Sequence, residues 1–320
     1  MNRANDQRMQ LGKTDVKVSP LGIGTWAWGD RWVWGYGKGD YTDEDIREAF
    51  EASRDAGVNA FDTAEVYGLG RSESLLGTFI QDTETRPLVM TKFMPLPWRL
   101  RKQALHRALQ HSLNRLGLTF VDLYQIHFPF PPVSIETWME AMAEAVEAGQ
   151  TRAVGVSNFS AKQMGRAHNA LADHGVPLAA NQVHYSLLHR QPEFNGVQQL
   201  CRDLDITLIA YSPLEQGILT GKYTPDHPPS GLRGRQYDAH YLAAVQPLLT
   251  RMEDIGEAHE GKTPAQVALN WVICKGAMPI PGAKNARHAR SNAGAMGWRL
   301  RDEEISELDE LSLRVSRAIE

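Results

Sequence analysis

The feature that most constrains the fold is a regular alternation of short apolar runs with amphipathic helical patterns. The runs are apolar throughout and rich in β-branched residues, as expected of parallel strands that are buried on both faces. Eight such runs are found, at residues 21–25, 60–64, 88–93, 121–127, 153–157, 179–184, 207–212 and 278–281. The alternation continues without a break in composition, which favours one domain over two.

Helical patterns fill the intervals between these runs. Apolar residues recur at helical spacing in segments 43–56, 73–80, 101–116 and 134–148. Ser160 with Gln163, and Thr263 with Gln266, have the spacing of capping boxes. We therefore predict a single (β/α)₈ TIM barrel over residues 1–320, with an N-terminal β-hairpin at 8–19 and extra C-terminal helices that include 302–319. A doubly wound sheet is the main alternative, but no G-x-G-x-x-G motif follows any predicted strand.

Composition and charge exclude several classes of protein. The 320 residues contain 34 basic and 38 acidic side chains, so the formal net charge is -4 and no footprint for nucleic acid or an anionic membrane is present. No run of eighteen apolar residues predicts a membrane span, and the polar first ten residues do not resemble a signal peptide. Cys201 and Cys274 show no zinc spacing, and we expect two buried thiols rather than a disulfide. A cytoplasmic protein that is a monomer or weak homo-oligomer is expected.

Two long segments that we expect to be loops interrupt the alternation, and both follow predicted strands. Residues 26–41 are rich in Trp and Gly, and residues 214–241 contain three prolines and several glycines. On a barrel both would lie at the C-terminal face, where active sites are built. Aromatic residues crowd the loops after strands one, three and four, and they predict an apolar pocket. These aromatics are Trp26, Trp28, Trp32, Trp34, Trp98, Phe128 and Phe130.

Three neighbouring predicted strands each end in an ionisable residue. Asp62, Lys92 and His127 close strands two, three and four, and Tyr67 follows Asp62 by five positions. Singly, each could be a rim charge or a satisfied buried group, but adjacent strands lie about 4.8 Å apart, so these side chains can converge. An Asp–Lys pair beside a tyrosine hydroxyl would stabilise the phenolate and lower its pKa toward the range of a general acid. A neutral His127 would orient a substrate carbonyl.

The chain also resembles the aldo-keto reductase superfamily from Leu11 to about Trp298. The matching segments carry strand ends and turns in the order that a barrel requires. They are LGIGTW at 21–26, DTAEVYG at 62–68, TK at 91–92, QIH at 125–127, GVSNF at 155–159, NQ at 181–182, YSPL at 211–214 and IPGAK at 280–284.

This resemblance implies an NADPH-dependent reduction of aldehydes or ketones to alcohols. Tyr67 matches the family's catalytic acid, with Asp62 and Lys92 tuning it. His127 matches the residue that polarises the carbonyl, and no metal is implied. The implied substrate is a small carbonyl compound, in a pocket that we expect to contain Trp26, Trp28, Trp34, Tyr67, His127 and Phe128.

The resemblance also implies where the cofactor binds. The carboxamide of the nicotinamide would meet Ser157, Asn158 and Gln182, and Tyr211 would stack on its ring. The loop at 212–217 would wrap the pyrophosphate. The complete implied set is Gly24, Thr25, Trp26, Asp62, Ser157, Asn158, Gln182, Tyr211, Ser212, Pro213, Leu214, Gly217, Leu219, Lys222, Pro281, Gly282, Lys284, His288, Ser291 and Asn292.

The adenosine end of this predicted site carries local positive charge. Lys284, Arg287, His288 and Arg290 lie at the opening of a predicted helix, which is a favourable place for an anion. Many relatives have Arg at the position of His288, so the main contact with a 2′-phosphate falls to Lys284 here, with Arg290 nearby. We therefore expect NADPH rather than NADH as the cofactor.

Two other functions fit parts of the same sequence. The superfamily includes channel-associated β-subunits that bind NADPH with little turnover, and slow turnover together with a membrane partner would favour that function. A Schiff-base aldolase with Lys92 as nucleophile would use the same barrel, and trapping of substrate on Lys92 by borohydride would support it. The nicotinamide-binding matches argue against the aldolase.

Overall fold

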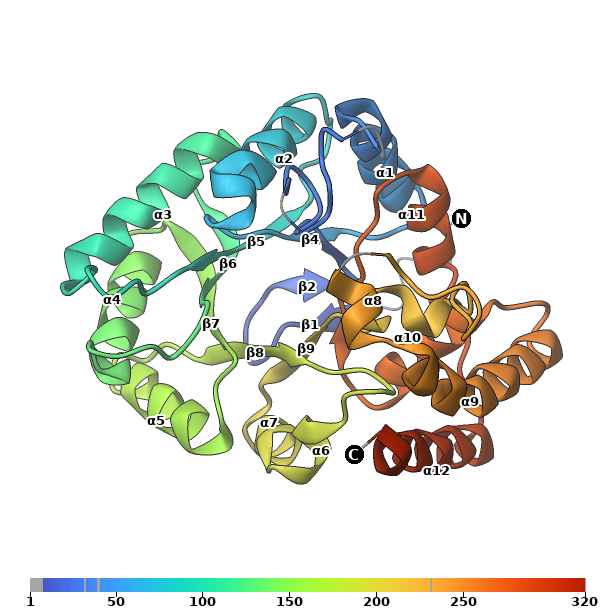
Figure 1. The fold of residues 1–320 in the computed structure, drawn as a ribbon. Coiled ribbons are helices and arrows are strands. Elements are labelled where there is room, and N and C mark those ends of the chain that lie inside the picture. Colours follow the sequence, from blue (N-terminus) through green and yellow to red (C-terminus); the bar gives the residue numbers. More distant parts are fainter. Residues whose placement is uncertain (1–7, 32, 39–40, 231, 320) are drawn as a thin grey trace.

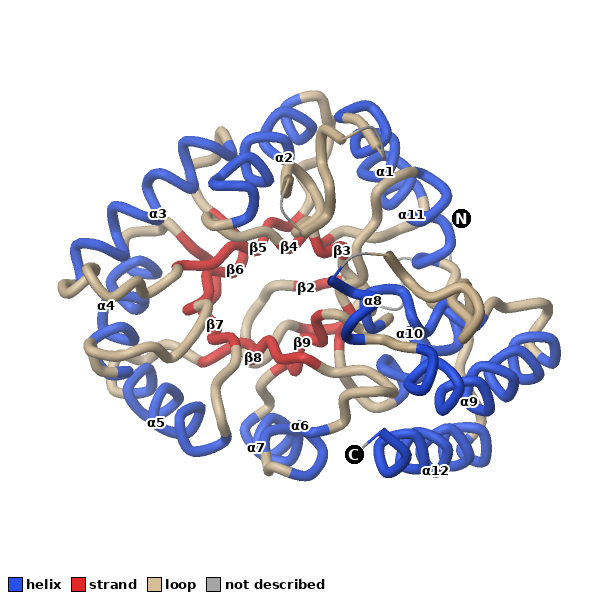
Figure 2. Tube along the Cα trace, in the orientation of Figure 1, coloured by secondary structure: helices blue, strands red, loops and turns tan. Residues whose placement is uncertain are grey.

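The computed structural model describes residues 8–31, 33–38, 41–230 and 232–319. Eight parallel strands form a curved sheet with helices outside it, which confirms the predicted barrel (Figures 1 and 2). The strands are β3 (Ile23–Gly24), β4 (Ala60–Asp62), β5 (Leu88–Phe93), β6 (Val121–Ile126), β7 (Thr151–Ser157), β8 (Leu178–His184), β9 (Thr207–Tyr211) and β10 (Met278–Pro279). The bounds of each of these strands lie within two residues of those of a predicted apolar run, and β3 and β10 are the shortest, with two residues each.

Backbone hydrogen bonds between the first and last strands complete the barrel. The N–H of Gly22 donates to the carbonyl of Pro279 at 3.0 Å, and the N–H of Gly24 donates to Pro281 at 3.1 Å. A parallel bridge also pairs Gly24 with Gly282. A Cβ atom on Gly24 would lie 2.8 Å from the carbonyl oxygen of Ile280, so this close approach requires glycine.

The helices surround the strands and cover their outer faces. Those that alternate with strands are α1 (Asp43–Asp55), α2 (Arg71–Gln81), α3 (Lys102–Leu116), α4 (Ile135–Glu147), α5 (Ala161–Ala172), α6 (Gln191–Phe194), α7 (Val197–Leu204), α10 (Pro264–Cys274) and α11 (Ala286–Ala293). Both predicted capping boxes are present, at the starts of α5 and α10. A further one, between Thr42 and Asp45, begins α1.

The N-terminal hairpin closes one end of the barrel. Strands β1 (Met9–Gln10) and β2 (Lys17–Val18) pair antiparallel, as predicted. Leu11, Val16 and Val18 are buried in one apolar cluster with residues from the barrel interior. The N–H of Gly12 donates to Oγ1 of Thr207 at the start of β9, at 2.8 Å. The hairpin therefore covers the N-terminal ends of the strands, and a functional site is left to the opposite end.

The segment after β9 is more regular than its proline and glycine content predicts. It contains the 3₁₀ segment η3 (Glu215–Thr220) and the short helix α8 (Leu232–Gln236), and α9 (Ala239–Ala258) begins before the predicted loop would end. The prediction of one continuous loop at residues 214–241 was therefore wrong. Short helices interrupted by left-handed residues have no sustained apolar period, so pattern analysis misses them.

The predicted C-terminal helix lies on the outside of the barrel. Helix α12 (Asp302–Ile319) is present at the predicted position and packs against α9. Cys201 and Cys274 are both free thiols, but only Cys201 is buried, and Cys274 is half-buried, contrary to expectation. Within the described residues, no helix has the length and apolar character needed to cross a membrane. Trp32 lies outside the described residues.

Candidate active site

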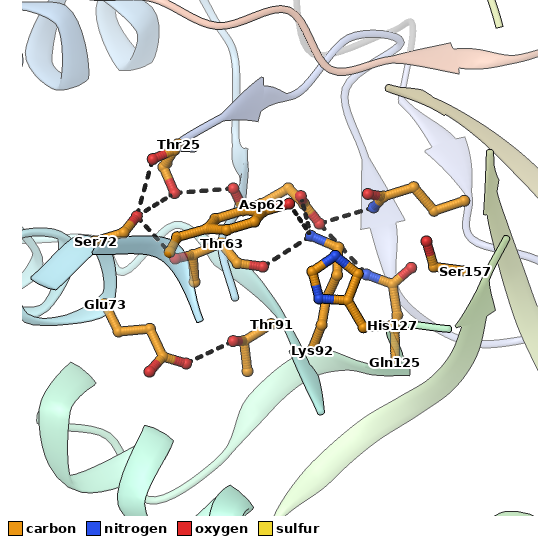
Figure 3. A network of polar contacts seen from close by, with 12 residues as sticks. Thr25, Asp62, Thr63, Ser72, Glu73, Thr91, Lys92, Gln125, His127 and Ser157 are labelled. Carbon is orange, nitrogen blue, oxygen red and sulfur yellow. Dashed lines mark hydrogen bonds and ion pairs between the residues drawn. The ribbon is translucent and has the colours of Figure 1, made fainter. Parts of the chain in front are cut away.

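Three of the predicted reaction residues, Asp62, Lys92 and His127, lie close together at the C-terminal end of the barrel (Figure 3), and Tyr67 contacts Lys92 there. Asp62 ends β4, Lys92 lies near the end of β5, and His127 follows β6. The 3₁₀ segment η2 (Tyr67–Gly70) brings Tyr67 back over these strand ends. Lys92 Nζ lies 2.5 Å from Asp62 Oδ2 and 3.4 Å from the Tyr67 hydroxyl oxygen. The rings of Tyr67 and His127 meet edge to face, with centroids 5.8 Å apart.

The ion pair of Asp62 and Lys92 is almost completely buried and is well supplied with hydrogen bonds. Lys92 Nζ also donates to the carbonyl of Thr63 at 2.8 Å. Asp62 Oδ1 accepts from Gln182 Nε2 at 2.9 Å and from Gln125 Nε2 at 3.3 Å. Such partners offset the cost of removing two charges from water. Burial alone would lower the pKa of Lys92, but the negative charge of Asp62 and its hydrogen bond with Nζ oppose this, and the pKa is raised overall, so the lysine stays cationic.

The pKa of Tyr67 does not fall as the sequence led us to expect. Burial raises the pKa of the phenol above its ordinary value, and the positive charge of Lys92 opposes this increase only in part. Asp62 adds to the increase, because its negative charge disfavours the phenolate. The expectation weighed Lys92 but not burial. In this structure Tyr67 is therefore a protonated phenol, the form from which a proton can be donated.

His127 is held as a neutral imidazole, as predicted. Burial, followed by the positive charge of Lys92, lowers its pKa to about 3. A neutral imidazole can donate a hydrogen bond to a carbonyl oxygen, and it places no second positive charge next to the Lys92 ammonium. The arrangement can thus place a proton donor, a cation and a hydrogen-bonding imidazole around one oxygen atom.

Two polar networks beneath these residues were not predicted from the sequence. Ser72 Oγ lies 2.7 Å from Thr25 Oγ1 and 3.0 Å from Thr63 Oγ1, so the start of α2 is tied to β3 and β4. Thr25 Oγ1 also lies 3.0 Å from the Asp62 carbonyl oxygen. These contacts fix the backbone next to the ion pair, and they occupy the side chain of Thr25, which was predicted to bind cofactor.

The second network lies under β5. Thr91 Oγ1 donates to Glu73 Oε1 at 2.6 Å, and Arg115 donates to Glu73 Oε2 at 2.7 Å. Glu73 is fully buried in α2, next in sequence to Ser72. Thr91 directly precedes Lys92 on β5. This network therefore holds in place the part of the strand that carries the lysine side chain. A Ser-Glu pair at the start of a helix is too common in surface positions to have indicated this role.

The residues assigned to the nicotinamide end lie on β7, β8 and β9. Asn158 adopts a left-handed conformation (φ +63°), and its Nδ2 donates to the His127 carbonyl at 3.1 Å and to Ser157 Oγ at 3.0 Å. Its Oδ1 accepts from the Tyr211 hydroxyl at 3.0 Å. Gln182 is the partner of Asp62 described above. The structure thus brings the predicted nicotinamide residues together with the reaction residues.

The pyrophosphate segment after β9 is strongly curved. Ser212, Glu215 and Gln216 have φ values of +51°, +46° and +51°, and Gly217 has +98°. Residues other than glycine rarely adopt this backbone conformation. Where several occur together, their backbone N–H groups often form a concave surface. Leu219, also predicted to bind cofactor, is fully buried, and neither its side chain nor its backbone is exposed in this structure.

Cationic side chains gather where the adenosine phosphate was predicted. Burial lowers the pKa of His288, and the charges of Arg287, Lys222 and Lys284 lower it further. These three cations come from two distant parts of the chain, the segment after β9 and the start of α11. Lys284 Nζ lies 4.9 Å from the ring centroid of Trp34 and donates to the Trp34 carbonyl at 3.3 Å.

Other residues at this end support the strand ends. The amide of Asn292 donates to the Gly282 carbonyl at 3.2 Å, which anchors α11 to the turn after β10. Pro281 is buried and Gly282 is exposed, while Ser291 is half-buried and Arg290 is exposed on α11. Side chains able to stack, donate hydrogen bonds and neutralise phosphates are thus present at β7 to β9, in the segment after β9 and at α11, and this donor set fits a nicotinamide dinucleotide.

Aromatic rings frame the reaction residues on two sides. Trp26 stacks on Tyr67 with centroids 6.2 Å apart and meets the edge of Trp34 at 5.6 Å. On the other side, His127 stacks on Phe128 at 5.1 Å, and Phe128 stacks on Phe130 at 4.9 Å. The predicted apolar surroundings of Tyr67 are therefore present.

Trp28 differs from the other predicted pocket residues. Its side chain is fully buried, packs against Phe61 and Phe79, and donates from Nε1 to the Ala283 carbonyl at 2.8 Å. Periodicity could not distinguish it from Trp26, because both lie in the same Gly-rich segment. Trp28 belongs to the core between the barrel and its helices, so its prediction as a substrate-pocket residue was wrong.

Comparison with known proteins agrees with this geometry. The model of the Aldo/keto reductase family matches residues 20–313. A pyridoxal reductase of the chloroplast from Arabidopsis thaliana is 39% identical over 316 residues, which cover 95% of this chain and 85% of that protein. The aldo-keto reductase YhdN of Bacillus subtilis is 31% identical, with 93% and 91% covered. The chain belongs to the aldo/keto reductase family, whose members are oxidoreductases acting on carbonyl compounds.

Solved structures show the same architecture. A thermostable aldo-keto reductase, Tm1743, crystallised with the inhibitor epalrestat, aligns with a TM-score of 0.75 at 32% identity, covering 95% of this chain and 99% of that one. The glycerol dehydrogenase AKR11B4 of Gluconobacter oxydans aligns with a TM-score of 0.84 at 26% identity, covering 98% and 96%. This chain thus shares its (β/α)₈ barrel with both of these proteins.

Proposed function

We propose that this protein reduces aldehydes and ketones to alcohols with NADPH, and that Tyr67 donates the proton. The observation that carries the proposal is the contact of the protonated Tyr67 hydroxyl with Lys92 Nζ at 3.4 Å, beside a neutral His127. When bound, NADPH supplies the hydride that reaches the carbonyl carbon.

The side chains of the chain have separate tasks in this reaction. His127 and Tyr67 hold the carbonyl oxygen by hydrogen bonds and draw charge toward it. As the oxygen becomes negative, the proton of Tyr67 moves to it, and the alcohol is formed. The phenolate left on Tyr67 is stabilised by Lys92, whose own charge is balanced by Asp62. A proton from solvent then restores the phenol.

The cationic residues near α11 support NADPH as the cofactor. Lys284, Arg287 and Lys222 surround His288 in a protein whose net charge is negative. A 2′-phosphate, which NADH lacks, would gain charge-assisted hydrogen bonds there. The absence of arginine at position 288 makes Lys284 the main candidate for this contact.

The aromatic surroundings support small planar aldehydes as substrates. Stacked rings of His127, Phe128 and Phe130 extend from the reaction residues to the exposed Phe130. A flat ring would stack there at low conformational cost. Pyridoxal is the first compound to test, because the similar protein from Arabidopsis thaliana is named a pyridoxal reductase.

A labelled cofactor tests the reaction directly. The purified protein should oxidise NADPH in the presence of pyridoxal or benzaldehyde, and NADPH carrying deuterium at the transferred position of C4 should place that deuterium on the carbinol carbon. No NADPH oxidation with any aldehyde in a broad panel, despite tight NADPH binding, would instead support the regulatory-subunit function.

A further inference from the structure

A further buried carboxylate, that of Glu215, lies behind the proposed nicotinamide site and has no part in the chemistry described above. Its Oε2 accepts a hydrogen bond from His184 Nε2 at 2.9 Å and another from Ser186 Oγ at 3.1 Å. Its Oε1 accepts from the Tyr237 hydroxyl at 2.9 Å. One side chain therefore joins the end of β8, the segment after β9 and the residues just before α9.

His184 connects this carboxylate to Tyr211. The two residues are paired in the parallel register of β8 and β9, and their rings stack with centroids 5.3 Å apart and planes 14° apart. His184 also stacks on His189, with centroids 3.9 Å apart. Because His184 donates to Glu215, the carboxylate fixes the rotation of the imidazole, and hence the surface against which Tyr211 rests.

The backbone around Glu215 is strained. Ser212, Glu215 and Gln216 are non-glycine residues in the left-handed region. This conformation is unfavourable for residues that carry a side chain, and it persists only where surrounding contacts determine it. The three hydrogen bonds to the Glu215 side chain are contacts of this kind.

We propose that Glu215 is a positioning residue for the nicotinamide cofactor. Through His184 it sets the plane of Tyr211, and through its own backbone it holds segment 212–222 in the curved form that receives the pyrophosphate. The inference rests on the proposed function, because it takes Tyr211 and this segment as cofactor contacts. Burial acts to raise the pKa of Glu215, but hydrogen bonds from His184, Tyr237 and Ser186 bring it below the usual value, so the acceptor stays ionised.

The substitution Glu215→Gln tests this role, because it keeps the shape of the side chain but removes its charge. Titration of protein fluorescence with NADPH and with NADH gives the two Kd values. Both should rise by roughly 10- to 100-fold, the value of one or two charged hydrogen bonds. They should rise by the same factor, because Tyr211 and segment 212–222 contact parts that both cofactors share.

The chain offers a matched control in a second buried Glu–His pair. Glu304 on α12 accepts from His259 Nε2 at 2.9 Å and is as well buried as Glu215, but it packs on the outer helices. Glu304→Gln should lower the Tm without changing either Kd. A comparable Tm loss in Glu215→Gln without a change in Kd would show a merely structural role and overturn the inference.

A second variant keeps the test decisive if Glu215→Gln folds poorly. His184→Phe retains a ring next to Tyr211 but cannot donate to Glu215, so it should also raise both Kd values. In the double variant the two effects should combine to less than their product, because both remove the same contact. Kd values within twofold of wild type for His184→Phe would contradict the inference.

The result for the unmodified protein separates this inference from the proposed function. A wild-type protein that binds neither cofactor would refute both. A wild-type protein that binds NADPH and reduces aldehydes, while Glu215→Gln and His184→Phe bind both cofactors equally well, would refute only the role of Glu215.

Discussion

Lys92 and Asp62 form an ion pair in which Nζ lies 2.5 Å from Oδ2 and neither side chain is appreciably exposed. The pair carries the positive charge that faces Tyr67, so its stability and its chemistry are linked. Gln125 and Gln182 hold the same carboxylate from the far side. Both charges of the pair are thus carried by the barrel strands β4 and β5 and not by a loop.

Removal of one partner of this pair should cost both activity and stability. In Lys92→Met, kcat/KM should fall at least about 100-fold, since the phenolate of Tyr67 loses its cation. The free energy of unfolding should fall by about 3 kcal/mol, because Asp62 remains buried without its counter-charge. Urea titration and steady-state kinetics measure the two effects.

The double variant Asp62→Asn/Lys92→Met separates stability from chemistry. It removes both charges, so most of the lost stability should return while activity stays low. Recovery of activity together with stability would show that Lys92 acts only on the fold.

Because His127 is buried and neutral, the free energy of unfolding should decrease as the pH falls. Its pKa is about 3 in the folded chain, against 6.5 for an unperturbed histidine, so the unfolded chain binds the proton more readily. The contribution of His127 is complete above about pH 6.5 and is lost as the pH falls toward 3. Between pH 7 and pH 4, wild type should lose about 3 kcal/mol more stability than His127→Gln. Parallel stability curves for the two proteins would show that His127 is not held neutral.

The cationic cluster near α11 predicts the choice of cofactor. Lys284→Ala should raise the Kd for NADPH roughly 10- to 100-fold and leave that for NADH within about twofold, because only NADPH has a 2′-phosphate. NADH serves as the control within the same protein. Equal losses for both cofactors would place Lys284 outside the 2′-phosphate site.

The closure of the barrel predicts a contrast between two glycines. Gly24→Ala should destabilise the protein by about 1–3 kcal/mol, because its Cβ would lie 2.8 Å from the Ile280 carbonyl oxygen. Gly165 lies within α5 with no atom within 4 Å of its Cβ position, so Gly165→Ala should stabilise by about 0.5–1 kcal/mol. Thermal unfolding measures both, and a neutral Gly24→Ala would mean that β3 and β10 approach less closely.

Much of the fold could be predicted because it depends on local patterns. Buried parallel strands are continuously apolar, capping boxes have fixed spacing, and these signals placed β5 and the starts of α5 and α10 correctly. The segment after β9 was missed because its geometry depends on left-handed residues and on one buried carboxylate, Glu215, whose partners are distant in sequence.

The candidate site could also be predicted only in part. Asp62, Lys92 and His127 could be expected to meet because they end neighbouring strands, and this needs only the strand order. The direction of the Tyr67 pKa could not be predicted, because it depends on how far burial outweighs Lys92. Trp28 and Trp26 could not be distinguished, because burial separates them and sequence spacing does not.

The central claim is that Tyr67 donates the proton, and Tyr67→Phe tests it most directly. The substitution removes only the hydroxyl and keeps the ring that stacks on Trp26. We predict that kcat for aldehyde reduction falls by about 100-fold or more while the Kd for NADPH stays within about twofold. Wild-type turnover in Tyr67→Phe with NADPH bound normally would contradict the account.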